Sequence, residues 1–187
     1  MSNLMMRMFN RQASDPRNKP DQILEALKLR QGQVLADLGA GGGYFSLRFA
    51  EAVGREGRVY VVDTNQGSLR FIENSAKEKG LGNVQTVLAT KEGLIFHGGS
   101  LDPVFARNVY HHLANRVEYF RRLRGALKRE GRIAIIEYRR GKPLTFHGIF
   151  GHYVPQETII KELGEAGYRV KQEISFLPEQ SFTIFSP

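Results

Sequence analysis

Short apolar runs alternate along the chain with longer segments in which apolar residues recur at helical spacing. Short apolar runs bounded by turn residues are typical of strands that are buried on both faces of a sheet. The runs predicted as strands lie at residues 34–38, 58–63, 83–88, 101–109 and 132–138. Helices are predicted between them at residues 44–53, 68–79 and 116–128. This alternation favours a parallel sheet with helices on both faces, a doubly wound α/β fold.

The two ends of the chain follow different patterns. Residues 1–20 show no clear period and contain two prolines, so we predict an N-terminal segment that is partly flexible or draped over the site. Asp21 is expected to cap a helix at 22–29, where the folded domain, residues 21–187, begins. The last helix and two closely spaced strands, expected to pair antiparallel, are predicted at residues 155–166, 168–176 and 181–185.

A strand, a glycine cluster and the start of a helix follow one another at residues 34–45. Glycine lets the backbone take positive φ and approach a ligand without a Cβ in the way. The first helical turn then offers unpaired N–H groups, so this order indicates a nucleotide-type site. The dinucleotide fingerprint requires its last glycine at position 44, which is Tyr44 here. A nicotinamide-dependent oxidoreductase is therefore a disfavoured alternative.

The pattern Asp37-x-Gly39-x-Gly41-x-Gly43 resembles the first motif of the class I S-adenosylmethionine-dependent methyltransferases. The resemblance implies a single-domain, Rossmann-like fold with seven strands, mostly parallel, and a C-terminal antiparallel hairpin. It also implies S-adenosylmethionine as the cofactor, S-adenosylhomocysteine as the product and a small-molecule methyl acceptor. The cofactor-binding residues that we predict are Asp37, Gly39, Ala40, Gly41, Gly43, Tyr44, Asp63, Thr64, Ala89, Thr90 and Asn108.

Two acidic residues and one missing acid bear on this site. Asp37 lies inside a strand and needs polar partners, either loop N–H groups or a ligand ammonium, unless its role is to fix the loop. Asp63 ends the second predicted strand, where a carboxylate can accept hydrogen bonds from both ribose hydroxyls; capping of the next helix is the alternative. In the resembled family this acid binds the ribose. Ala89 stands where the family usually has an acid for the adenine amine, which leaves that contact to Thr90, the backbone or nothing.

The run Tyr110-His111-His112 follows the fourth predicted strand and resembles the fourth motif of the small-molecule branch of the family. The resemblance places Asn108 toward the methionine part of the cofactor. Histidine ordinarily titrates near neutral pH, so His111 or His152 is the candidate general base, and His112 is expected to turn away. A structural hydrogen bond is the alternative role for these histidines. Two adjacent histidines without a third ligand make a poor metal site, so we expect no metal.

The composition adds one alternative function and excludes several classes of site. A formal net charge of +8 suggests a nucleic-acid partner, which makes an RNA-modifying or nucleic-acid-binding protein the second alternative. Many arginines, however, fall opposite the apolar stripe of the helix at 116–128, where a solvated face explains them. The chain has 0 Cys and therefore no disulfide, thiol metal site or cysteine nucleophile. No apolar run approaches membrane-spanning length, so we expect a cytoplasmic protein without a membrane partner.

Overall fold

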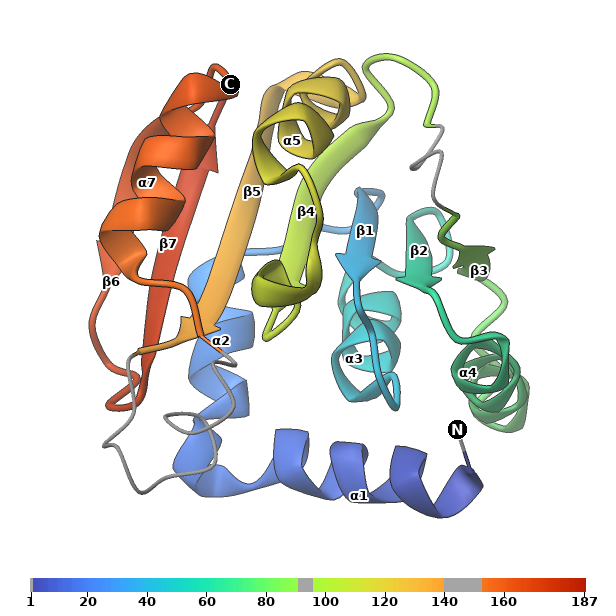
Figure 1. The fold of residues 1–187 in the computed structure, drawn as a ribbon. Helices are drawn as coiled ribbons and strands as arrows, with labels where there is room; N and C mark the ends of the chain where they lie inside the picture. Colours follow the sequence, from blue (N-terminus) through green and yellow to red (C-terminus); the bar gives the residue numbers. More distant parts are fainter. Residues whose placement is uncertain (1, 91–95, 140–152) are drawn as a thin grey trace. The chain divides into compact units, whose positions relative to one another are not determined.

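The computed structural model describes residues 2–90, 96–139 and 153–187 (Figure 1). The chain forms two compact units, residues 1–94 and 95–187. Each unit contains strands of a β-sheet together with helices that pack on them.

The first unit contains three parallel strands in the order β3-β2-β1. Leu35 of β1 pairs with Val59 of β2, and Val61 of β2 pairs with Thr86 of β3. The strands and helices of this unit are α1 (Asn3–Ser14), η1 (Pro16–Asn18), α2 (Pro20–Leu27), β1 (Val34–Leu38), α3 (Tyr44–Val53), β2 (Arg58–Asp63), α4 (Gln66–Glu78) and β3 (Val84–Leu88). Because parallel neighbours point the same way, β1, β2 and β3 deliver their carboxyl ends to one edge.

The second unit combines one parallel and two antiparallel strand pairs. β4 and β5 are parallel, and β7 runs antiparallel to both β5 and β6. The predicted C-terminal antiparallel hairpin is therefore present. The elements are β4 (Leu101–Arg107), η2 (Tyr110–His112), α5 (Arg116–Arg124), β5 (Leu127–Tyr138), α7 (Gln156–Glu165), β6 (Arg169–Ile174) and β7 (Gln180–Ser186).

Two predicted helix boundaries were wrong. Lys19, in the left-handed region at φ 49°, precedes α2, and Asp21 instead lies in the first turn, where it binds Arg48 at 2.7 Å. The helix predicted at 116–128 ends at Arg124 because the following backbone already pairs with the segment before β4: the carbonyl oxygen of Gly125 accepts from the N–H of Gly99 at 3.1 Å.

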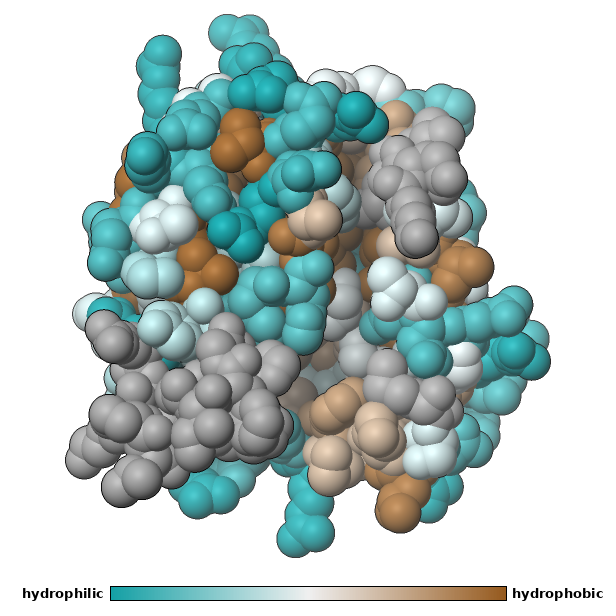
Figure 2. Space-filling model, viewed as in Figure 1, coloured by the Kyte–Doolittle hydropathy of each residue, from teal (hydrophilic) through white to brown (hydrophobic). Residues whose placement is uncertain are grey.

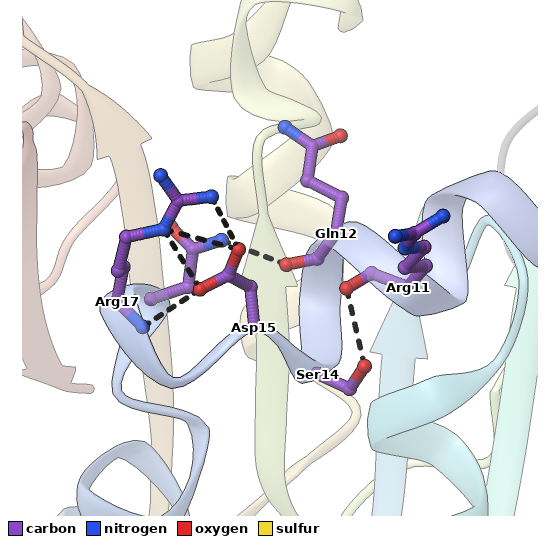
Figure 3. A network of polar contacts seen from close by, with 6 residues as sticks. Arg11, Gln12, Ser14, Asp15 and Arg17 are labelled. Carbon is purple, nitrogen blue, oxygen red and sulfur yellow. Dashed lines mark hydrogen bonds and ion pairs between the residues drawn. The ribbon is translucent and has the colours of Figure 1, made fainter.

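Residues 3–14 form a helix where the sequence showed no helical period. The side chain of Ser2 accepts from the N–H of Met5 at its start, and the helix contacts α3 and α4. Figure 3 shows the far end, where the Asp15 carboxylate binds Arg17 at 2.6 Å and the Arg17 guanidinium lowers the pKa of Asp15 to about 2. The inward face of this helix combines apolar Met6 with polar Asn10.

Candidate active site

The glycine loop joins β1 to α3 through three residues in left-handed backbone. Gly39, Gly41 and Gly43 have φ values of 66°, 58° and 82°, which L side chains rarely adopt. The N–H groups of Gly39 and Ala40 donate to the carbonyl oxygen of Val62 at 2.8 and 3.3 Å, which fixes the start of the loop on β2. Glycine is therefore required at these three positions by the backbone itself.

Asp63 leaves the end of β2 and connects the glycine loop with the turn before α4. Its Oδ2 accepts from the N–H of Gly41 at 3.2 Å, and its Oδ1 accepts from the N–H of Asn65 at 2.8 Å. Asn65, rather than Asp63, caps α4, because its side chain accepts from the N–H of Ser68 at 3.0 Å. The helix-capping alternative for Asp63 was therefore wrong, and its half-buried carboxylate lies beside the loop.

Asp37 is buried within β1, with only 3% of its surface exposed. Its Oδ2 accepts from the Ser46 hydroxyl at 2.5 Å, so α3 supplies the polar partner. Burial raises the pKa of Asp37 to about 7; the Ser46 hydrogen bond opposes the shift and the Asp63 charge adds to it. This hydrogen bond links β1 to α3 across the glycine loop.

The remaining residues predicted in the first unit lie at the ends of β2 and β3. The N–H of Ala89 donates to the carbonyl oxygen of Asp63 at 2.9 Å, so the two strand ends are tied together. Thr64 and Thr90 are exposed, and Ala89 is half-buried. The structure thus brings Gly41, Asp63 and Ala89 to one edge of the sheet.

In the second unit, Asn108 follows β4 with a positive φ of 54°. Its N–H donates to the carbonyl oxygen of Ile136 at 2.8 Å, and its Oδ1 accepts from the Gln180 amide at 2.5 Å. Gln180 Oε1 also accepts from Arg107 at 3.2 Å. One β7 side chain therefore orients two consecutive residues at the carboxyl end of β4.

His111 pairs with Glu137, which is fully buried near the end of β5, and 8% of the His111 side chain is exposed. His111 Nδ1 lies 3.0 Å from Glu137 Oε2, and the N–H of His111 donates to the same oxygen at 3.3 Å. The other oxygen, Oε1, accepts from the N–H of Tyr138 at 2.9 Å. A carboxylate at Nδ1 favours a proton there and leaves Nε2 as the basic nitrogen. The carboxylate therefore fixes the position and tautomer of the imidazole.

The residues on either side of His111 differ from it in their surroundings. Tyr110 is fully buried, stacks on Phe120 with ring centroids 5.4 Å apart, and donates its hydroxyl to Glu162 at 2.7 Å. His112 is exposed, and its ring centroid lies 4.0 Å from that of His111. His152 lies outside the described residues.

Three residues at these sites were missed by the sequence analysis. Asn10 reaches the glycine loop from α1, Gln180 reaches Asn108 from β7, and Glu137 meets His111. Of these three residues, only Glu137 could have been identified from the sequence, because it is an acid at the end of the apolar run 133–136. Among residues 2–90, 96–139 and 153–187, no group of three His, Cys, Asp or Glu side chains is placed to hold a metal. No helix in these described ranges is both long and apolar enough to cross a membrane.

A family model described as "Methyltransferase domain" matches residues 35–131, more than half of the chain. The chain belongs to the methyltransferase domain family. The match begins in β1 and includes the glycine loop, Asp63, Asn108 and His111. It confirms the predicted family and the cofactor of this domain, S-adenosylmethionine, and it contradicts the nicotinamide alternative.

The methyltransferase domain is also similar to individual proteins. It is 24% identical over 152 residues to the ubiquinone/menaquinone biosynthesis C-methyltransferase UbiE of Idiomarina loihiensis, covering 81% of this chain and 60% of that protein. It is 31% identical over 117 residues to the UbiE of Yersinia enterocolitica, covering 62% and 46%. The chain thus spans about half to 60% of the length of these relatives.

A solved structure described as a SAM dependent methyltransferase from Aquifex aeolicus matches with a TM-score of 0.88 and 17% identity. The likeness covers 99% of this chain and 98% of that one. It confirms the predicted fold class, the Rossmann-like methyltransferase fold.

The buried carboxylate of Asp37 predicts a pH dependence of stability. Its folded pKa of about 7 lies above its ordinary value of 3.8, so the folded protein binds the extra proton between these values. Stability therefore falls as the pH rises through this window, and ionisation in the folded state costs at most about 4 kcal/mol. We measure the free energy of unfolding of Asp37→Asn and of wild type by urea denaturation. We expect the value for Asp37→Asn to rise relative to that of wild type as the pH is raised from 5 to 8. Parallel pH curves for the two proteins would contradict this assignment.

Proposed function

We propose that this protein transfers a methyl group from S-adenosylmethionine to a ring carbon of a hydroxylated aromatic small molecule of the quinol type. The observation that carries this proposal is the pairing of His111 with the buried Glu137 at the carboxyl ends of β4 and β5. A base of this kind is needed where the acceptor must lose a proton before it is nucleophilic. The UbiE relatives, described as quinone-biosynthesis C-methyltransferases, support a carbon acceptor in a quinone-like ring.

The first unit holds the cofactor in this proposal. The left-handed glycines keep side chains out of the loop backbone, and Asp63 presents a half-buried carboxylate beside it, which fits the ribose hydroxyls of a nucleoside. Thr64, Ala89 and Thr90 border the same strand ends, and Asn108 is assigned to the methionine part. When bound, the cofactor supplies an electrophilic methyl on a sulfonium, so the protein mainly aligns the acceptor.

His111 is the catalytic base in this proposal, and Glu137 is its positioning residue. With Nδ1 facing Glu137, the other ring nitrogen, Nε2, accepts the proton of an acceptor hydroxyl in this proposal. Loss of that proton raises electron density on the ring carbon that takes the methyl. The methylated carbon then gives up its own proton and the ring oxygen is protonated again, which restores the aromatic ring with a net release of one proton.

The arginines of α5 do not support the nucleic-acid alternative. Arg121 and Arg122 both bind Glu118 on the exposed face of the helix, at 2.7 and 2.8 Å. Arg116 binds Glu162 of α7 at 2.7 Å. These pairings agree with the solvated helix face that explains the charges.

Replacing Asp63 tests the ribose role. Asp63→Ala removes charge-assisted hydrogen bonds, so we expect affinity for S-adenosylhomocysteine, measured by calorimetry, to drop by about 1.5–3 kcal/mol. The carboxylate also accepts from the N–H groups of Gly41 and Asn65, one on each oxygen, so Asp63→Asn, which keeps an acceptor for one of them, serves as the nearest variant. An Asn variant that loses affinity while keeping its thermal stability locates the effect in the ligand contact. Unchanged affinity in a folded Ala variant would contradict the role.

Replacing His111 tests the general base. We expect His111→Ala to lower the rate of methyl transfer by about 10²-fold or more and to leave affinity for S-adenosylhomocysteine unchanged. His112→Ala is the matched control, since His112 is an exposed neighbour of the same type, and it should retain activity. Equal rates for His111→Ala and wild type would leave alignment alone as the source of catalysis.

Glu137→Gln tests the positioning role by separating kcat from KM. Gln has one acceptor oxygen where the carboxylate has two, so it cannot serve both His111 and Tyr138, and kcat should fall while KM for S-adenosylmethionine is unchanged. A loss of kcat matched by an equal loss of thermal stability would assign Glu137 to structure only.

A further inference from the structure

The N-terminal helix α1 contacts the glycine loop directly. Asn10 Oδ1 accepts from the N–H of Tyr44 at 3.0 Å, and Tyr44 is the first residue of α3. The N–H groups of a first helical turn have no partner within their own helix. Gly43, which precedes Tyr44, has no side chain to serve as a cap. Asn10 therefore caps α3 from a different helix.

The space around Gly42 gives a second observation of the same contact between α1 and the glycine loop. Its φ is not in the left-handed region, unlike those of Gly39, Gly41 and Gly43, so its own backbone does not require glycine. A Cβ at position 42 would lie closer than 3.0 Å to the Asn10 side chain and to the carbonyl oxygen of Met6. Real Cβ atoms essentially never approach other atoms so closely. Gly42 is thus glycine because α1 lies against it.

Phe9 extends this contact to the centre of the loop. Its ring carbon Cδ2 lies 3.6 Å from the place where a Cβ of Gly41 would be, and Gly41 is the residue whose N–H donates to Asp63. Two consecutive residues of α1 thus stand beside two consecutive glycines of the loop.

The rest of α1 is weakly held. Met6 is the only buried side chain of this helix. Leu4 and Met8 are 79% and 57% exposed, and Figure 2 shows apolar and hydrophilic side chains side by side at the lower edge, where α1 lies in Figure 1. An element with few buried contacts opens at low free energy. Release of α1 from the loop would expose one buried apolar side chain, Met6.

We propose that α1 is a releasable wall of the cofactor site, with Asn10 as a positioning residue that holds the glycine loop and Phe9 as the side chain that covers it. Seated α1 slows dissociation of the cofactor, and release of α1 opens the way out. The inference rests on the proposed cofactor role of the loop, and it does not depend on the identity of the methyl acceptor.

The experiment measures the affinity and the dissociation rate of S-adenosylhomocysteine, together with hydrogen exchange of residues 3–14. We expect Asn10→Ala and Gly42→Ala each to weaken binding by about tenfold, mainly through faster dissociation, and to speed exchange in α1. Asn10→Asp keeps an acceptor at the start of α3 and should restore binding. The Asn10→Ala, Gly42→Ala double variant should bind no more weakly than Gly42→Ala alone, since both changes break one contact.

Gly82→Ala is the matched control, because Gly82 has an ordinary φ and no atom within 4 Å of the added Cβ. It should bind S-adenosylhomocysteine like wild type. If α1 exchanges faster in Asn10→Ala while affinity and dissociation rate are unchanged, α1 is a structural element and the proposal is overturned. Tighter binding by that variant overturns it as well, because α1 would then obstruct the site. A wild-type protein that fails to bind S-adenosylhomocysteine instead overturns the cofactor assignment, and hydrogen exchange still reports separately whether Asn10 seats α1.

Discussion

The left-handed backbone between β1 and α3 is the constraint on which the proposed chemistry depends. Three glycines in that conformation let the chain leave the sheet, turn and enter a helix within a few residues. The surrounding polar groups then act on this turn. Asp63 accepts from Gly41, Asp37 binds Ser46 on the far side of the loop, and Asn10 caps the helix that follows.

Three carboxyl groups serve different purposes because their surroundings differ. Asp37 is buried with a single neutral donor beside it, which raises its pKa and suits a structural role between strand and helix. Asp63 is half-buried at a strand end, where a ligand can reach it. Glu137 is fully buried, yet both of its oxygens have donors. The hydrogen bonds of Glu137 therefore orient His111 rather than a ligand.

The strands, most helices and the glycine loop could be predicted because their signals are local. Apolar runs, glycines and an acid at a strand end lie within a few residues of one another in the segments 34–45 and 58–63. The contacts that were missed join distant positions: Asn10 and Tyr44 are 34 residues apart, and Gln180 and Asn108 are 72 apart. No local period marks such pairs. Helix α1 was missed for a related reason. The face that it turns inward contacts the distant glycine loop and includes the polar residue Asn10.

The most direct test follows a labelled methyl group from S-adenosylmethionine to a panel of hydroxylated aromatic acceptors, with the methylated atom located by mass spectrometry. We expect label on a ring carbon of a quinol-type acceptor, with S-adenosylhomocysteine formed in equal amount. Label on RNA, on an acceptor oxygen or on no acceptor in the panel, from a protein that binds S-adenosylhomocysteine, would contradict it.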